Sequence, residues 1–138
     1  MRAVDVSLLI LRLTMAAVMW PHGAQKALGW FGGPGLAGIV AGMHGHFGIP
    51  LPLIYLVVVA EFLGPIALVL GILTRFAALG IAIDMVTAAV LAHAQNGFFM
   101  NFSGKQKGEG VEFFILLAGI GLALAIAGPG RIAIMKRF

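Results

Sequence analysis

Long apolar runs, separated by short polar or glycine-rich stretches, dominate the chain. A helix needs about 20 mainly apolar residues to cross the hydrocarbon core of a bilayer. Four runs meet that length, at roughly residues 4–28, 53–73, 76–94 and 111–127. The pattern therefore predicts an all-α, polytopic membrane protein in which one domain, residues 1–138, forms a four-transmembrane-helix bundle.

The stretches between the runs are typical of turns and loops. GWFGGPGLAG follows the first run, GILTR joins the second to the third, and QNGFFMNFSGKQKGEG precedes the fourth. We expect residues 34–52 to form a short amphipathic or re-entrant segment. Residues 33–38 match the pattern G-x-G-x-x-G, but they follow a membrane helix rather than a strand, and Pro34 lacks an N–H. We therefore interpret them as a loop and not as a dinucleotide site.

Composition supports a membrane location and excludes several kinds of chemistry. Hydrophobic residues make up 61% of the chain and charged residues 10%, whereas soluble domains have about 25% charged residues. The net charge of +4 reflects Lys and Arg at helix flanks, not a basic stripe with aromatic residues, so no nucleic-acid partner is expected. The chain has no cysteine, which excludes disulfides, thiol catalysis and cysteine-ligated clusters within it.

The start of the chain resembles a signal peptide, but Asp5 and Arg12 interrupt its apolar region, so we interpret it as a retained helix. Five basic residues lie on the side of the two termini and three on the other side, which favours termini in the cytoplasm. The first group is Arg2, Arg75, Arg131, Lys136 and Arg137, and the second is Lys26, Lys105 and Lys107.

Three charged residues fall well inside the apolar runs: Arg12, Glu61 and Asp84. Each costs about 2.5–3.5 kcal/mol on membrane-insertion scales, a cost that is usually retained for pairing or function. Because the three lie at comparable depth, we expect an intramembrane ion-pair network. The alternative is that Arg12 and Glu61 form a purely structural pair.

Backbone and helix geometry predict how the helices present these charges. Pro65 lies four residues after Glu61 and has no N–H for the Glu61 carbonyl, which predicts a kink with a free carbonyl beside the carboxylate. Asp84 and His93 are about 180° apart on a regular helix, so they share a cavity only if that helix is distorted. The first helix has a polar face within an arc of about 80°, formed by Arg12, Met15, Met19, His22 and Lys26.

Near the outer membrane face, His22, Lys26, His93 and Glu112 come together with Glu61 as the expected rim of a polar pocket. Three of these residues also have a simpler interpretation. Lys26 snorkels to the headgroups beside Trp20 and Trp30, Glu112 suits the positive end of a helix dipole, and His93 is an interfacial histidine. His44 and His46 have a spacing that can bind metal, but they lack a third ligand, so no metal site is predicted.

Several stretches together resemble the DoxX family of small four-helix membrane proteins: LRLTMAAVMWPHGAQKALGWFGG, AEFLGPIALVLGILTR, HAQNGFF and GVEFFILLAGIGLALAIAGPGR. The resemblance implies a bundle in the bacterial cytoplasmic (inner) membrane. Some relatives are described as subunits of a thiosulfate:quinone oxidoreductase, and others as partners of redox enzymes in oxidative-stress defence. The residues that match the family pattern are Arg12, His22, Lys26, Glu61, His93 and Glu112, whereas Asp84, His44 and His46 lie outside it.

The hypothesis that follows is an integral membrane subunit of a redox system, with a quinone or a small anionic or sulfur substrate in the polar pocket. Glu61, His93 and Glu112 are the candidate catalytic groups, and Arg12, His22 and Lys26 the candidate substrate-binding groups. Electrons must come from a protein partner or a bound haem, of which the haem is the less favoured, so the chain is not expected to be active alone. The alternatives are a small-solute transporter, which would need a homo-oligomer, and a scaffold that recruits a redox enzyme.

Overall fold

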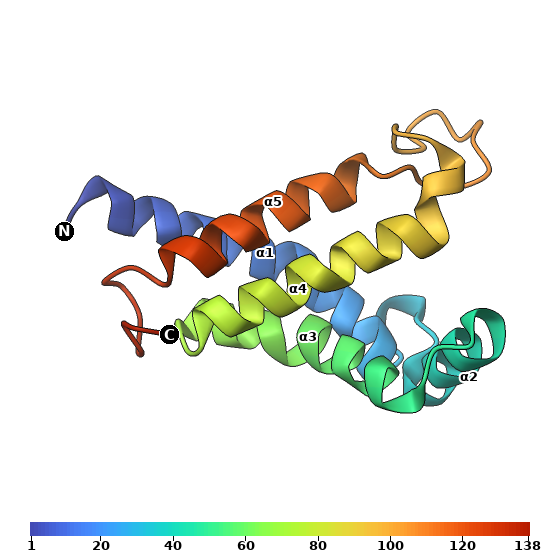
Figure 1. Cartoon of the computed structure of the whole chain (residues 1–138), viewed down its shortest axis with the longest axis horizontal. Helices are drawn as coiled ribbons and strands as arrows, with labels where there is room; N and C mark the ends of the chain where they lie inside the picture. The colour runs from blue at the N-terminus through green and yellow to red at the C-terminus, as the bar shows by residue number, and fades with distance from the viewer.

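The computed structural model describes residues 1–138 and contains helices and loops but no strands. The helices follow one another along the chain as α1 (Ala3–Ala27), η1 (Trp30–Gly32), α2 (Gly35–Phe47), α3 (Leu51–Leu70), α4 (Thr74–Ala88), η2 (Ala89–His93), η3 (Ala94–Asn96) and α5 (Glu112–Ala127) (Figure 1). The predicted all-α fold class is therefore confirmed.

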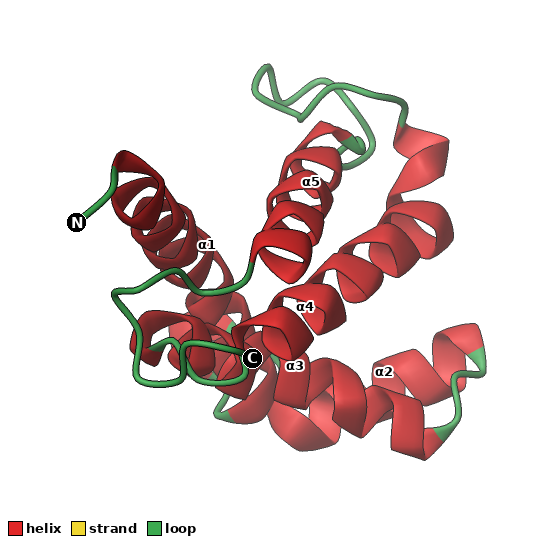
Figure 2. Cartoon of the chain, turned by 60° about the vertical axis from the view of Figure 1, so that its left-hand side comes forward, coloured by secondary structure: helices red, strands yellow, loops and turns green.

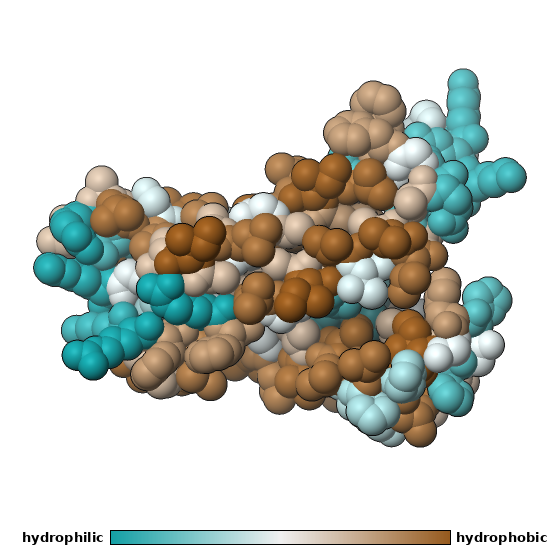
Figure 3. Space-filling model, viewed as in Figure 1, coloured by the Kyte–Doolittle hydropathy of each residue, from teal (hydrophilic) through white to brown (hydrophobic).

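Three helical segments are long and apolar enough to cross a membrane: α1, α3, and the continuous run Thr74–Asn96 that begins with α4. The fourth, α5, is equally apolar in character but has only 16 residues. Figure 3 shows the matching surface, which is hydrophobic along the middle of the molecule and hydrophilic at its two ends. A lipid-facing belt of this kind is what a polytopic membrane protein requires.

The bundle is built from two helical hairpins. The first helix of each hairpin, α1 or α4, starts at the same end of the molecule, and the second, α3 or α5, returns to it. In each hairpin the two helices pack extensively on each other, α1 on α3 and α4 on α5, and α3 packs on α4 to join them. Both termini and the turn between α3 and α4 lie at one end, here called the terminal end (Figure 1). The opposite end, here called the loop end, holds α2 and residues 97–111. Contact between α1 and α5 is much smaller, and Figure 2 shows these two helices set apart.

Small residues allow the helices to approach closely. A Cβ added at Gly121 of α5 would lie 2.8 Å from the carbonyl oxygen of Ala78 in α4. Gly64 of α3 faces Ile81 of α4 in a similar way, with 3.2 Å between the added Cβ and the Ile81 Cδ1. Because lipid tails are as apolar as the helix surfaces, packing of this kind is a main source of association in membranes.

The terminal end is tied together by Arg75 and the C-terminal tail. The Arg75 guanidinium donates hydrogen bonds to the last carbonyls of α5, including that of Ala125 at 2.9 Å. The tail returns to α3, since the Met135 N–H donates to the Gly71 carbonyl at 2.9 Å. Asp5, fully buried in the first turn of α1, accepts a hydrogen bond from the Arg131 N–H at 3.0 Å. The contacts of Arg75 and Met135 satisfy carbonyls that a helix C-terminus otherwise leaves free.

Residues 34–52 contain a regular α-helix, α2. α2 has 13 residues and not one buried side chain, and it ends at Gly48 in the left-handed conformation, with φ of +66°. Its length is too short to span a bilayer, which agrees with the expectation of a short segment. The two prolines inside helices, Pro21 and Pro65, do not end them: α1 and α3 each continue as one α-helix.

Candidate functional site

A salt bridge between α1 and α3 lies at the centre of the candidate site. The Lys26 ammonium donates a hydrogen bond to the Glu61 carboxylate, and the Glu61 side chain is only 5% exposed. The expected pairing of Glu61 with Arg12 is therefore wrong. Lys26 takes that place because its position near the loop end of α1 faces Glu61 across the antiparallel hairpin.

The backbone beside this salt bridge is unusually close. A Cβ on Gly23 would lie 2.1 Å from the Glu61 carbonyl oxygen and 2.6 Å from the Phe62 Cα. Pro65 cannot donate to that carbonyl because it lacks an N–H, so Gly23 packs against the backbone group that the proline leaves free. The glycine allows α1 to approach α3 closely enough at this level for the long Lys26 side chain to reach Glu61.

Asp84 of α4 completes a buried cluster. Its carboxyl lies next to that of Glu61, within hydrogen-bonding range, and close enough to Lys26 for a direct electrostatic interaction. Asp84 is 8% exposed, and its Oδ2 atom has no hydrogen-bond partner. Lys26, Glu61 and Asp84 are called the Lys26 cluster below. It joins α1, α3 and α4 and contains one ammonium against two carboxyl groups.

His22 lies at the edge of the cluster. It is within electrostatic reach of both Lys26 and Glu61, and its own residue surface is exposed. At the loop end, Figure 3 shows a hollow between the surface over α4 and the surface over α2 and α3, with hydrophilic atoms at its base. A polar ligand could therefore approach the cluster from the loop end.

Arg12 lies elsewhere, at the terminal end. Its guanidinium donates four hydrogen bonds to backbone carbonyls and has no carboxylate partner. The acceptors are Leu68 at 2.8 Å, Val69 at 3.1 Å, Pro129 at 3.0 Å and Ile132 at 2.6 Å. The expected network of Arg12 with Glu61 and Asp84 is wrong for a physical reason. Gly23 is the residue of α1 that packs on the Glu61 backbone, so Arg12 lies 11 residues, about 16 Å, nearer the terminal end, and its side chain points further in that direction because side chains of a helix tilt toward its N-terminus.

His93 is turned by a local distortion of the helix. Ala89–His93 form a π-helical turn, which winds more residues into each turn and so changes the direction of every side chain after it. The His93 ring then stacks on Phe114 of α5, with 4.4 Å between ring centroids, and its Nδ1 lies 2.9 Å from the Glu109 carbonyl oxygen. The distortion of the helix between Asp84 and His93, which the sequence pattern set as the condition for the two to face one cavity, is therefore present.

The two histidines are connected by aromatic rings rather than by direct contact. The ring centroids of His22 and Phe113 are 6.1 Å apart, those of Phe113 and Phe114 are 5.4 Å apart, and Phe114 continues to His93. Such offset and edge-to-face distances are favourable for aromatic pairs. An aromatic row on α5 thus runs from the edge of the Lys26 cluster to the loop of residues 97–111.

Glu112 orders that loop. As the first residue of α5, it accepts a hydrogen bond from the Met100 N–H at 2.9 Å, and it forms no ion pair. Glu109 supports the same loop, since its carboxylate accepts from the Asn101 N–H and its carbonyl from the Asn96 side chain at 3.0 Å. The structure therefore brings together His22, Lys26 and Glu61, adds Asp84, and leaves Arg12 and Glu112 in other contacts.

The remaining histidines stay apart from the site. His44, near the end of α2, has its Nδ1 atom 2.9 Å from the Ile49 carbonyl oxygen, and the His46 ring packs edge-on against Phe47. No group of three or more His, Cys, Asp and Glu side chains is arranged to hold a metal ion.

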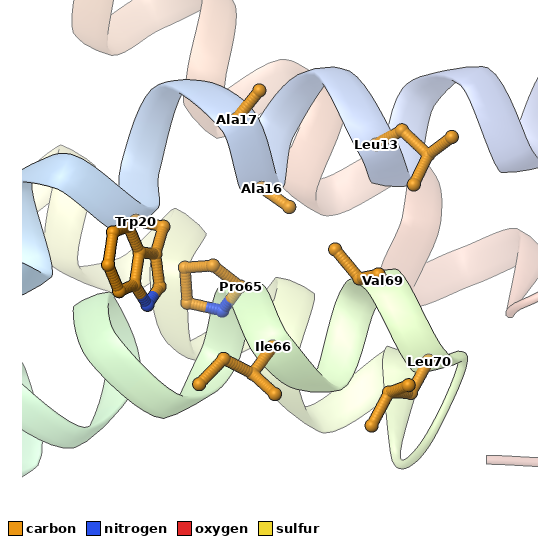
Figure 4. A pocket seen from close by; sticks show the side chains of 8 residues that line it. All are labelled: Leu13, Ala16, Ala17, Trp20, Pro65, Ile66, Val69 and Leu70. Atoms are coloured by element: carbon orange, nitrogen blue, oxygen red, sulfur yellow. The ribbon is translucent and has the colours of Figure 1, made fainter.

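Two apolar grooves on the sides of the bundle lie outside the Lys26 cluster. The first, about 390 Å³, runs between α1 and α3, with Trp20 at its loop-end edge (Figure 4). It is lined by Leu13, Ala16, Ala17, Trp20, Pro65, Ile66, Val69 and Leu70. The second, about 420 Å³, lies between α4 and α5 and includes Phe114. Grooves lined almost wholly by apolar atoms suit hydrocarbon chains, so neither explains the buried charges.

The fold and the site together define a small polytopic membrane protein with a buried cluster of charged side chains toward its loop end. The sequence profile of the DoxX family matches residues 7–94, and the chain belongs to this family. The matched part contains the whole Lys26 cluster, together with Arg12, His22 and His93. DoxX proteins are generally membrane proteins associated with redox and stress processes. No curated protein and no solved structure matches the chain.

Proposed function

We propose that this DoxX protein is the membrane subunit of a redox system and that it binds a quinone headgroup at the Lys26 cluster. The observation that carries the proposal is the buried salt bridge of Lys26 and Glu61 with the adjoining, unpartnered Asp84 carboxyl. Charged groups inside a membrane bundle are costly and commonly mark substrate or proton sites.

The residues present suit the chemistry of a quinone. Its carbonyl oxygens need hydrogen-bond donors, which the Lys26 ammonium and a ring nitrogen of His22 can supply. Its flat apolar ring suits aromatic side chains, and Phe113 lies next to His22 at the edge of the cluster. A quinone reaches such a site through the membrane, since the middle of the bundle face shown in Figure 3 is mainly hydrophobic.

The charge balance favours a neutral ligand over a small anion. The cluster contains two carboxyl groups and one ammonium, and that ammonium is already paired with Glu61, so no cation is left over to balance a sulfur oxyanion. Arg12, the cation that was expected to help, is bound to carbonyls at the terminal end. The sequence-based alternative of an anionic substrate therefore has less support from the geometry than a quinone.

Electrons must come from a partner, because the chain has no cysteine and its histidines do not form a haem site. A bis-histidine haem needs two ligands that face one iron, whereas His22 and His93 each pack on a different phenylalanine. The ordered loop of residues 97–111 is the surface to which we assign partner binding. In this proposal both termini are cytoplasmic and the Lys26 cluster opens to the outside of the bacterial inner membrane.

Quinone binding can be measured directly in detergent. Purified protein is titrated with a short-chain ubiquinone, and the fluorescence of Trp20 and Trp30 reports binding. Lys26→Met should weaken binding at least tenfold, about 1.4 kcal/mol, whereas the matched variant Lys105→Met in the exposed loop should bind like the parent. Equal affinity of Lys26→Met and the parent, with unchanged circular dichroism, would contradict the proposal.

A further inference from the structure

We propose that the two carboxyl groups of the Lys26 cluster, Glu61 and Asp84, together hold one proton in the resting protein, and that Asp84 is the residue that carries and releases it. Nothing in the family resemblance assigns a role to Asp84. The inference deepens the proposed function, and it rests on that function only for the identity of the group that receives the proton.

The first argument is the count of charges in a buried space. With Lys26 protonated and both carboxyls ionised, the cluster would hold a net negative charge in a site where Glu61 and Asp84 are both less than 9% exposed. Burying an unpaired charge is expensive, and a group in that position neutralises instead. One proton added to the pair of carboxyls gives one ammonium and one carboxylate, which is a neutral cluster.

The second argument assigns the proton to Asp84. Glu61 accepts the hydrogen bond of Lys26, so Glu61 is the stabilised carboxylate. The Asp84 Oδ2 atom is buried and has no donor. Two ionised carboxylates are acceptors only and cannot bond to each other, whereas a protonated Asp84 has an O–H that can donate to Glu61. The adjacency of the two carboxyls is thus explained by a proton between them.

The surroundings offer no second cation that would remove the need for the proton. On α1 the other titratable group facing the cluster is His22, which lies at its exposed edge. On α3 it is Glu61 itself. On α5, which packs against α4, the titratable residue is Glu112, and its carboxylate is bound to the Met100 N–H in the loop. Arg12 is bound to backbone carbonyls at the terminal end.

The proton has a use in the proposed reaction and a route by which it returns. Two-electron reduction of a quinone consumes two protons, while the electrons come from the partner protein. Asp84 supplies one of these protons, and water at the loop end supplies the other by way of His22. The Asp84 O–H bond breaks, an O–H bond forms on the substrate oxygen, and the new Asp84 carboxylate is stabilised by Lys26. Water at the loop end, by way of His22, then restores the proton to Asp84.

Infrared spectroscopy of the purified chain without quinone tests the inference separately from quinone binding. A protonated carboxyl has a C=O stretching band that shifts to lower frequency in D₂O. At neutral pH the parent should show one such band per chain, since a carboxyl in water with a pKa of about 4 would be ionised. Both Asp84→Asn and Glu61→Gln should lose the band, because each leaves one carboxylate for one ammonium.

Two further variants make the test specific. Lys26→Met should double the band, because a cluster without its ammonium must protonate both carboxyls to be neutral. Glu112→Gln, a change of the other half-buried acid near the loop end, should keep one band. Absence of the band in the parent, or its persistence in Asp84→Asn, would overturn the inference whatever the quinone titration shows. Circular dichroism and a single gel-filtration peak establish that each variant is folded.

Discussion

Gly23 of α1 lies directly against the backbone of Glu61 in α3, so closely that a Cβ on Gly23 would fall 2.1 Å from the Glu61 carbonyl oxygen. Real Cβ atoms do not approach backbone atoms to that distance. The glycine therefore sets the distance between the two helices at the level of the Lys26–Glu61 salt bridge. Pro65 contributes from the other side, since it leaves this carbonyl without its usual partner in the helix.

Replacing Gly23 with alanine should push α1 and α3 apart at this point. We expect Gly23→Ala to lower stability by about 1–3 kcal/mol, the usual cost of overpacking, and to weaken quinone binding because Lys26 no longer reaches Glu61. Thermal unfolding in detergent and the fluorescence titration measure the two effects. Gly119→Ala is the matched control, since a Cβ there meets no atom within 4 Å. Equal behaviour of the two variants would contradict the close approach.

Arg12 should matter for stability rather than for ligand binding. Arg12→Met removes the donor from four carbonyls at once, and leaving buried acceptors unsatisfied costs about 1–3 kcal/mol each. We expect a loss of about 3–5 kcal/mol, seen as a lower unfolding temperature. Arg12→Lys should recover only part of it, because an ammonium cannot match the fork of a guanidinium.

The same variants separate the two roles that the sequence left open for Arg12. If Arg12→Lys remains folded, its affinity for a short-chain ubiquinone should equal that of the parent, because the guanidinium is bound at the terminal end. A tenfold weaker affinity in a folded Arg12→Lys protein would show that Arg12 takes part in the binding site after all.

Arg75 should keep the C-terminal tail in place. Its guanidinium donates to carbonyls in the last turn of α5, and its own N–H donates to the Phe138 carbonyl at 2.6 Å. Arg75→Ala should raise hydrogen–deuterium exchange in residues 128–138, and we expect a modest loss of about 1–2 kcal/mol, because part of this contact is exposed. Arg137→Ala, a surface change in the tail, should leave exchange unaltered. Unchanged exchange in Arg75→Ala would contradict this role.

Glu112 should control the order of the loop at residues 97–111. Glu112→Ala removes the acceptor of the Met100 N–H, so we expect faster trypsin cleavage after Lys105 and Lys107 within that loop. A severalfold rise in the cleavage rate corresponds to about 1 kcal/mol of lost local stability. Thr87→Val on α4 should not change the rate. If cleavage is equally slow in Glu112→Ala, the loop does not depend on this carboxylate.

The apolar pattern was sufficient to predict the membrane helices. Runs at 4–28 and 53–73 correspond to α1 and α3 within a few residues, because about 20 apolar residues in a row have no other stable place than a bilayer. Helical periodicity also placed His22 and Lys26 on one side of α1. The salt bridge between Lys26 and Glu61 followed only from packing, since depth along a helix does not say which side chain faces which.

Two residues show why depth alone was misleading. Arg12 and Glu61 were expected to pair because the sequence places them at comparable depth, but the residue of α1 that lies level with Glu61 is Gly23. Arg12 comes 11 residues earlier in α1, about 16 Å nearer the terminal end. Asp84 had no sequence signal beyond its burial in an apolar run. Its place beside Glu61 depends on the close contact of α3 with α4 at Gly64 and Ile81, which no spacing along one helix encodes.

By itself, the sequence determined the class of protein, the helices and their alternating direction, because these follow from hydropathy and chain connectivity. It also determined that a few charges must be buried in a membrane. The tertiary structure decided the partners of these charges. Glu61 contacts Lys26 and Asp84, Arg12 binds backbone carbonyls, and Glu112 binds the loop of residues 97–111. The physical reason is that electrostatic and hydrogen-bond energies change over a few ångströms, and distances of that size are set only when helices pack.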